Sequence, residues 1–598
     1  MTLYWQDKLS GTAVCISGNI LPKHFGGTEL ILKNSDINTD IIIEKNRIYE
    51  IEITAQGVSG EGIGKIDGFT VFVKNAVCGD RLRIKILKVN KSYAFAKIES
   101  IITPSPHRAK PACSIYKQCG GCNIMHIDYG EQLKFKQRRV YDALTRIGGF
   151  ENAEVTPTCG METPCRYRNK TQLPVGRGRS GQIVTGFFMP RTHTICPADD
   201  CVVSADVLPK LIAALKRYMA KYKIEPYDET KHRGVIRHLF VRTAKNGDVM
   251  AVVVTNSINL EHSDSLVRMF RESCKGIVSI IQNINTEKTN LILGKNNVTL
   301  WGADKLTDTI GNLSFEISPL SFYQVNSAQT EVLYKTALDF AALTGRENVF
   351  DLYCGTGTIS LFMAQRAKSV FGVEIVPEAV ADARKNAERN NISNAHFYCG
   401  SAEKTVTELY NAGERADVVV FDPPRKGADE TTLSIIIKMA PKRIIYVSCN
   451  PETLARDAKF LHENGGYELI KACPVDMFPH TTHVETVVLL SHKKPDGHIN
   501  VKVEFGEGEG KVPLDNIVKR AEEYKPKERV TYKMIKEYIE AKYGFKVHTA
   551  YIAEVKRDLG LPMYDAPNAV EELKQPRKHP TAEKVEAIKD ALKHFEII

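Results

Sequence analysis

The chain has 598 residues, of which 43% are hydrophobic and 25% charged, as is typical of globular proteins with several domains. No apolar run approaches the ~20 residues needed to cross a bilayer, and the first residues lack a secretory pattern, so we expect a cytoplasmic protein without membrane contact. The net charge of +10 is compatible with a polyanionic partner, and the 14 cysteines should be mostly reduced in that compartment.

The first part of the chain predicts an extension followed by a small barrel. Residues 1–40 show no clear periodicity, whereas residues 41–103 alternate apolar and polar residues in short runs broken by Gly, Asn and Asp. Five such strands favour a closed barrel of the OB type, a common platform for nucleic acids. One side would be basic, although ordinary surface lysines would give the same pattern. These lysines are Lys85, Lys88, Lys91 and Lys97.

A cysteine cluster opens the next region, residues 104–314, which we expect to be a mixed α+β domain. Cys113, Cys119 and Cys122 form the pattern C-x5-C-G-G-C, and three thiols this close need a fourth ligand to hold a metal. Cys196 and Cys201 are the downstream candidates. The spacing allows either structural zinc or an iron–sulfur cluster, and the C-x3-C-x2-C pattern of radical enzymes is absent. A basic helix is predicted within residues 123–150.

Residues 315–492 alternate strand and helix, which predicts an open parallel sheet. "NVFDLYCGTGTISLFMA" reads as a strand, a turn containing Gly355 and Gly357, and a helix. Glu374 ends the next strand about 20 residues later, where a carboxylate can bind ribose hydroxyls. The third glycine of dinucleotide-binding enzymes is missing, so S-adenosylmethionine is favoured over NAD as the ligand.

Two further strands of this region end in reactive or acidic residues. "VVVFDPP" ends at Asp422, and "RIIYVSCNP" places Cys449 before a strand-ending Asn-Pro pair. Parallel strands end on one rim, so Glu374, Asp422 and Cys449 should lie together. A thiolate there could add to carbon 6 of uracil and make carbon 5 nucleophilic, and Glu485 in "THVETV" could later remove the carbon 5 proton. A cysteine at a strand end is more often a small buried residue, and DPP also occurs in methyltransferases that act on exocyclic nitrogens.

Residues 493–598 form a Lys/Glu-rich and mostly helical extension. Two amphipathic helices around "GFKVHT" suggest a small helix-turn-helix-like unit. The extension would either bind RNA through basic helices or be a solvated appendage.

Specific motifs link this chain to a known family. They are "CSIYKQCGGC", "RYRNKTQLPV", "GVIRHLFVR", "SFYQVN", "DLYCGTGTISL", "FGVEIVPEAV", "DPPRKG", "YVSCNPETLARD" and "DMFPHTTHVETVVLL". Over roughly residues 45–492 the chain resembles the RNA uracil-5-methyltransferase family, most of all the iron–sulfur branch that methylates 23S ribosomal RNA. The stretch "ITAQGVSGEGIGKIDGFTVFVKNAVCGDRLRIKI" resembles a TRAM domain.

The resemblance implies a Rossmann-like methyltransferase sheet preceded by a TRAM barrel and an iron–sulfur domain, acting on large-subunit ribosomal RNA. It also implies that the helical stretch near 123–150 packs back on the catalytic domain. We expect a monomer. Cys449 would be the nucleophile, Glu485 the proton acceptor, and Phe322 a stacking partner for the extruded base. The implied S-adenosylmethionine contacts are Gln324, Tyr353, Glu374 and Asp422. The implied ligands of a [4Fe–4S] cluster are Cys113, Cys119, Cys122 and Cys201, with Cys196 at a position that is usually aliphatic in the family.

Three alternatives remain open from the sequence. Transfer RNA is the rival substrate, although that branch typically lacks the cysteine cluster and the front barrel. The fold could instead be an inert RNA-binding module, which the presence of both Cys449 and Glu485 disfavours. The third alternative is an iron–sulfur redox enzyme, which would turn over without methyl transfer.

Overall fold

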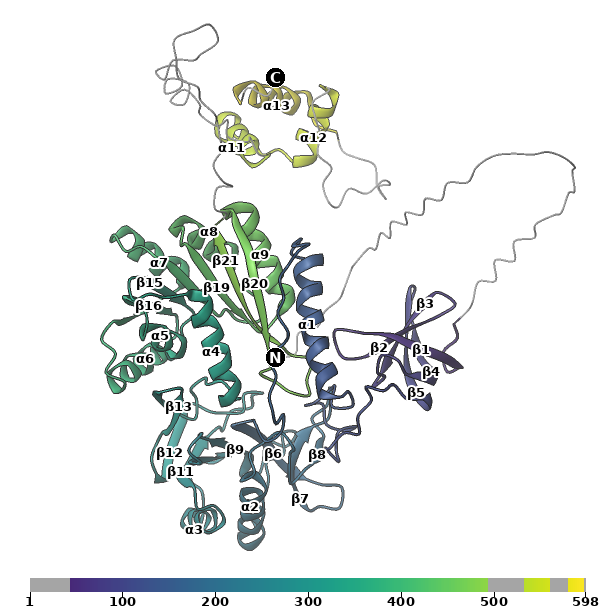
Figure 1. The fold of residues 1–598 in the computed structure, drawn as a ribbon, viewed down its shortest axis with the longest axis vertical. Helices are drawn as coiled ribbons and strands as arrows, with labels where there is room; N and C mark the ends of the chain where they lie inside the picture. Colours follow the sequence, from purple (N-terminus) through teal and green to yellow (C-terminus); the bar gives the residue numbers. More distant parts are fainter. Residues whose placement is uncertain (1–42, 493–531, 560–578, 596–598) are drawn as a thin grey trace, which may run out of the picture. The chain divides into compact units, whose positions relative to one another are not determined.

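The computed structural model describes residues 43–492, 532–559 and 579–595 (Figure 1). The chain divides into two compact units, residues 1–495 and residues 496–598. In the described ranges, no helix combines the length and the apolar character that crossing a membrane requires. The predicted extension of residues 1–40 lies outside the described residues.

Five strands at the start of the described chain form a closed barrel in the order β1-β2-β3-β5-β4. They are β1 (Ile48–Gln56), β2 (Gly62–Ile66), β3 (Phe69–Lys74), β4 (Arg81–Val89) and β5 (Tyr93–Thr103). Inward-pointing residues such as Ile53, Val71 and Leu82 form the core. A Cβ atom at Gly64 would lie 2.3 Å from the carbonyl oxygen of Glu52, so two strands can approach closely only at a glycine. The predicted small barrel is confirmed.

The central region contains α1 (Tyr129–Arg146) and a seven-stranded sheet in the order β12-β11-β10-β9-β6-β7-β8. Its strands are β6 (Lys170–Arg177), β7 (Ile183–Phe188), β8 (Ile195–Pro197), β9 (Ile236–Thr243), β10 (Val249–Thr255), β11 (Ile277–Ile284) and β12 (Asn296–Gly302). The helices α2 (Leu208–Tyr222) and α3 (Ser263–Ser273) share an apolar core with this sheet. A hairpin of β13 (Leu306–Ile310) and β14 (Leu313–Ile317) leads into the next sheet.

The third sheet has the order β17-β16-β15-β18-β19-β21-β20. Its strands are β15 (Asn348–Leu352), β16 (Ser369–Glu374), β17 (Ala395–Cys399), β18 (Val418–Phe421), β19 (Arg443–Ser448), β20 (Tyr467–Val475) and β21 (Glu485–His492). Neighbouring strands from β17 to β19 are parallel, whereas β21 runs antiparallel to both β19 and β20. The predicted open, mostly parallel sheet is confirmed, and its strand order reverses between β15 and β18, where such sheets bind ligands.

Helices cover both faces of this sheet (Figure 1). One face packs against α4 (Ser327–Ala341), α5 (Thr358–Ala364) and α6 (Pro377–Arg389). The other packs against α7 (Ala402–Asn411), α8 (Glu430–Met439), α9 (Pro451–Gly465) and α1 of the central region. Arg139 of α1 forms a bidentate ion pair with Glu452 of α9, with both distances at 3.0 Å. The segment that follows the cysteine cluster is therefore anchored directly to the third sheet.

The second unit contains α11 (Tyr532–Tyr543), α12 (Thr549–Asp558) and α13 (Ala582–His594). Ile539, Ile552 and Ile588 are fully buried in a small core that all three helices share. Residues 496–598 contain 19 Lys and Arg and 19 Asp and Glu, so the net charge of +10 belongs to residues 1–495. Long-range attraction to a polyanion is therefore expected from the first unit, not from this one.

Candidate active site

A cavity of about 1490 Å³ opens at the carboxyl ends of the central strands of the third sheet. The residues singled out in the sequence lie around it in one group. Those that line the cavity are Gln324, Tyr353, Glu374, Asp422, Cys449 and Glu485, together with Phe322. The structure thus brings the predicted donor-binding residues and both predicted catalytic residues to a single space.

The turn after β15 shapes one wall of this cavity. Tyr353, Gly355 and Gly357 all have positive φ angles, of 66°, 55° and 79°. At Gly357 a Cβ atom would lie 2.9 Å from the Phe397 ring, so this position requires glycine. Glu374 accepts hydrogen bonds from the backbone N–H of Gly355 at 3.1 Å and from that of Val376 at 2.9 Å. These bonds fix the carboxylate beside the turn.

Strand register brings Cys449 and Glu485 together. Ser448, the last residue of β19, pairs with Thr486 near the start of the antiparallel β21. Cys449 and Glu485 therefore flank the same end of one strand pair. Asn450 then caps α9 by accepting a hydrogen bond from the Glu452 backbone N–H, so the chain turns away directly after the cysteine. The thiol is half-buried at the rim and is not enclosed in the core.

Several titratable groups of the cavity have raised pKa values. Burial, reinforced by the Asp422 carboxylate, raises the pKa of Glu485 to about 8, and the side chain of Glu485 is only 5% exposed. Burial also raises the pKa of Asp422 to about 7. The pKa of the Cys449 thiol rises to about 11 through burial, then through Glu485 and Asp422, while Arg425 acts in the opposite direction. Such a site favours a cationic ligand, which would lower all three pKa values.

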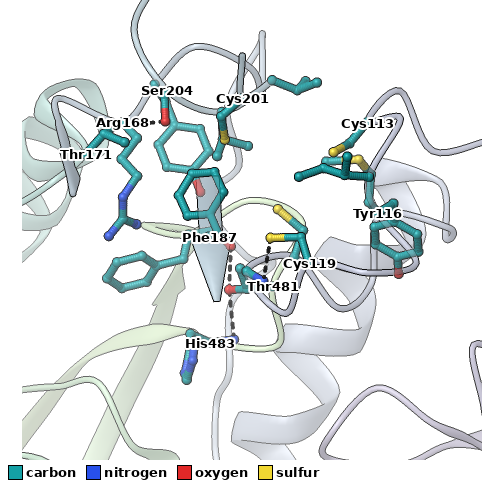
Figure 2. A pocket seen from close by; sticks show the side chains of 18 of the residues that line it. Cys113, Tyr116, Cys119, Arg168, Thr171, Phe187, Cys201, Ser204, Thr481 and His483 are labelled. Carbon is teal, nitrogen blue, oxygen red and sulfur yellow. Dashed lines mark hydrogen bonds between the residues drawn. The ribbon is translucent and has the colours of Figure 1, made fainter. Parts of the chain in front are cut away.

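A second cavity, of about 380 Å³, is lined by the cysteines (Figure 2). Cys113, Cys119, Cys122 and Cys201 all contribute to its wall. Burial, followed by the three neighbouring thiols, raises the pKa of Cys122 to about 12. Four thiols this close can ionise together only if cations share the cavity.

The two candidates for the fourth ligand occupy different places. Cys201 lines the cysteine cavity, whereas Cys196 is fully buried in β8 and does not line it. The Cys196 sulfur instead contacts the Gln118 side chain at 3.5 Å. This placement favours Cys201 as the fourth member of the set.

Three residues that the sequence analysis did not single out line both cavities: Arg425, Phe478 and His483. Arg425 directly follows "DPP", and His483 precedes Glu485 by two residues. Their closeness in sequence to predicted site residues could have identified them as candidates. Figure 2 shows His483 below Thr481, from whose side-chain oxygen its backbone N–H is 3.2 Å away.

Comparisons with known proteins agree with this geometry. A family model described as "tRNA (Uracil-5-)-methyltransferase" matches residues 239–493, and a TRAM domain model matches residues 44–98. An uncharacterized RNA methyltransferase of Clostridium tetani is 50% identical over 76% of this chain and 98% of its own length. A second one, from Halalkalibacterium halodurans, is 47% identical over 75% of this chain and 98% of its own length.

A solved structure is also similar. The tRNA (uracil-54, C5)-methyltransferase of Pyrococcus abyssi, in complex with S-adenosyl-L-homocysteine, aligns with a TM-score of 0.60 and 27% identity over 74% of this chain and all of that one. The strand order and the acidic cavity at the strand ends define a Rossmann-like methyltransferase preceded by a TRAM barrel. The chain belongs to the RNA uracil-5-methyltransferase family.

Proposed function

We propose that this protein transfers a methyl group from S-adenosylmethionine to carbon 5 of a uridine in 23S ribosomal RNA. The observation that carries the proposal is the pairing of β19 with β21, which sets a thiol and a buried carboxyl side by side in the cavity. Gln324, Tyr353, Glu374 and Asp422 would bind the donor there. When bound, the donor supplies an electrophilic methyl group.

The chain's own residues would act in two steps. The Cys449 thiolate adds to carbon 6 of the uracil ring, and the resulting enolate attacks the methyl group through carbon 5, so that neutral S-adenosylhomocysteine departs. The Glu485 carboxylate then removes the proton from carbon 5, the carbon 5–carbon 6 double bond re-forms, and the thiolate leaves. A cationic donor beside these groups favours their ionised forms, which the free site disfavours.

The uridine must leave its stacked position to reach Cys449. Phe322 is 71% exposed at the cavity and offers an aromatic face for the extruded base. The barrel, which belongs to the unit that carries the net positive charge, supplies a surface for the surrounding RNA.

The cysteine cavity would hold a [4Fe–4S] cluster. No three His, Cys, Asp or Glu side chains in the described part of the chain stand close enough to hold one metal ion. A four-iron cluster takes one thiolate at each iron, so its ligands are spread more widely. The lining also includes Arg168, Lys170 and Arg425 but no carboxylate, which suits an anionic group. The cluster would connect the Cys113–Cys122 segment to Cys201 and serve a structural role.

Transfer RNA is the second candidate substrate, because the P. abyssi structure is a transfer-RNA enzyme. The barrel and the four-cysteine cavity favour ribosomal RNA, through the resemblance to the iron–sulfur branch. Mapping 5-methyluridine in 23S ribosomal RNA and in transfer RNA from cells that lack this protein separates the two. If only transfer RNA lacks the methyl group in these cells, transfer RNA is the substrate and the proposal of ribosomal RNA is wrong.

The chemistry is tested with two variants of the purified protein. Cys449→Ala should abolish methylation because the enolate cannot form, whereas Glu485→Gln should accumulate a covalent protein–RNA adduct because proton removal fails. The adduct is measured as a slowly migrating band on a denaturing gel. Normal turnover by Cys449→Ala, or free release of product by Glu485→Gln, would refute the assigned roles.

A further inference from the structure

The segment that delivers Glu485 to the cavity has no regular secondary structure. Residues 476–484 connect β20 to β21 and end directly before Glu485. Most of these residues are nevertheless buried, and His480 has a φ of +67°, which a residue with a side chain rarely adopts. Such a backbone persists only when the surroundings hold it.

A polar face of α1 holds this segment. Its four members recur at intervals of three and four residues, so they lie on one side of the helix. They are Tyr129, Gln132, Lys136 and Arg139. Tyr129 donates to Asp476 at 2.9 Å, and Gln132 accepts from the His480 backbone N–H at 3.0 Å.

The other two members of this face are cations. Lys136 forms an ion pair with Asp476, both side chains being fully buried, and donates to the Phe478 carbonyl at 3.1 Å. Arg139 donates to the Thr482 carbonyl at 2.8 Å. The helix α1 thus contacts the 476–484 segment at positions 476, 478, 480 and 482.

Asn123 adds a clamp nearer to the catalytic end. Its amide nitrogen donates to the Thr482 hydroxyl at 3.1 Å, and its amide oxygen accepts from the Thr482 backbone N–H at 3.0 Å. The backbone N–H groups of Asn123 and Ile124 both donate to the His480 carbonyl at 3.1 Å. Thr482 is three residues, or about 10 Å of extended chain, from Glu485. If the bonds between Asn123 and Thr482 are lost, the position of the Glu485 carboxyl is therefore less well fixed.

We infer that Asn123 and the polar face of α1 are positioning residues that set the Glu485 carboxylate for removal of the carbon 5 proton. This inference rests on the proposed function, in which Glu485 is the proton acceptor. Cys449 follows β19, which pairs with β18 and β21 and not with the 476–484 segment. Arg139 also reaches the Cys449 side, through Glu452 of α9, whereas the side chain of Asn123 binds Thr482 of the segment. Loosening the clamp should therefore slow the second chemical step more than the first.

The test uses Asn123→Ala in the full-length protein, with unmodified 23S ribosomal RNA transcript and methyl-labelled S-adenosylmethionine. In single turnover, the labelling of RNA reports methyl transfer, and the loss of the covalent band reports release. The rate of release should fall about 10-fold, and the rate of methyl transfer should stay within about 2-fold of that of the parent protein. A misplaced Glu485 carboxylate slows only the step in which it removes the proton. Thr482→Val, which keeps the bond from its backbone N–H, should give the same pattern more weakly.

Gln137→Ala is the matched control. Gln137 also lies on α1 and is half-buried, but its amide donates to the Val155 carbonyl at 3.0 Å, outside the segment. In this variant the rates of methyl transfer and of release should change by the same factor, if they change at all. If Asn123→Ala and Thr482→Val slow both steps equally, or neither, the positioning role is wrong while the proposed function stands. If Glu485→Gln accumulates no adduct, the base assignment fails and the inference falls with it.

Discussion

The buried carboxyl of Glu485 should make the free protein less stable as the pH rises. Glu485 is 5% exposed and its pKa is raised to about 8, against 4.5 for an ordinary glutamate. Below pH 4.5 the folded and unfolded states both hold the proton, and no difference arises. Between pH 4.5 and 8 the unfolded chain ionises while the folded site retains the proton, so the free energy of unfolding falls over this range. Glu485→Gln removes that penalty.

The size of the effect follows from the displacement of the pKa. A rise from 4.5 to about 8 corresponds to roughly 5 kcal/mol at most. Asp422 lines the same cavity and titrates together with Glu485, so removing one carboxyl relieves only part of the cost. We expect Glu485→Gln to raise the free energy of unfolding by about 2 kcal/mol at pH 8 and by almost nothing at pH 4.5.

Thermal unfolding of the ligand-free protein between pH 5 and pH 8.5 measures this difference. The control is Glu463→Gln, which changes a glutamate with 58% side-chain exposure on α9 and should leave the pH dependence unchanged. A gain of equal size at every pH would show that better packing, not relief of charge, stabilises the variant. A loss of stability at pH 8 would refute the reasoning outright.

Three further outcomes follow from the same contacts. S-adenosylmethionine should bind more tightly as the pH rises from 6 to 8, because ionised Asp422 and Glu485 attract its sulfonium, whereas calorimetry with neutral S-adenosylhomocysteine should show a weaker trend. Cys201→Ser should lose visible iron–sulfur absorbance and Cys196→Ser should keep it; the reverse would move the fourth ligand. Lys136→Met should destabilise the protein by about 3–5 kcal/mol by stranding Asp476, while Lys134→Met, with 69% side-chain exposure, should barely shift the melting temperature.

The sequence predicted those parts of the site that follow from local rules. A strand that ends in a polar residue places it at the carboxyl edge, so Glu374, Asp422 and Cys449 could be assigned to one rim without coordinates. Glu485 was harder, because it begins its strand. It reaches the same rim only because β21 runs antiparallel to β19. The direction of a strand in a sheet cannot be predicted from the sequence of that strand alone.

The individual contacts between distant segments could not be predicted from the sequence, although the family resemblance implied that the stretch 123–150 packs on the catalytic domain. The sequence predicts a basic helix within residues 123–150, and nothing in its composition distinguishes Lys136 from its exposed neighbours. A lysine is rarely buried without a partner, and here the partner, Asp476, is 340 residues away. Spacing alone did not separate Cys196 from Cys201, which lie five residues apart; the family resemblance favoured Cys201, and the two side chains face different surroundings in the structure.

The electrostatics of the cavity link stability to chemistry. The carboxyl groups of half-buried Asp422 and of buried Glu485 line the same cavity, and their raised pKa values mean that ionising them costs the folded protein free energy when no cation is present. In the proposed mechanism a cationic methyl donor relieves that cost and also lowers the pKa of the Cys449 thiol, so donor binding would activate the nucleophile. After methyl transfer the donor product is neutral, and the Glu485 pKa should return toward its raised value. A higher pKa would make the Glu485 carboxylate a stronger base in the proposed step that removes the carbon 5 proton.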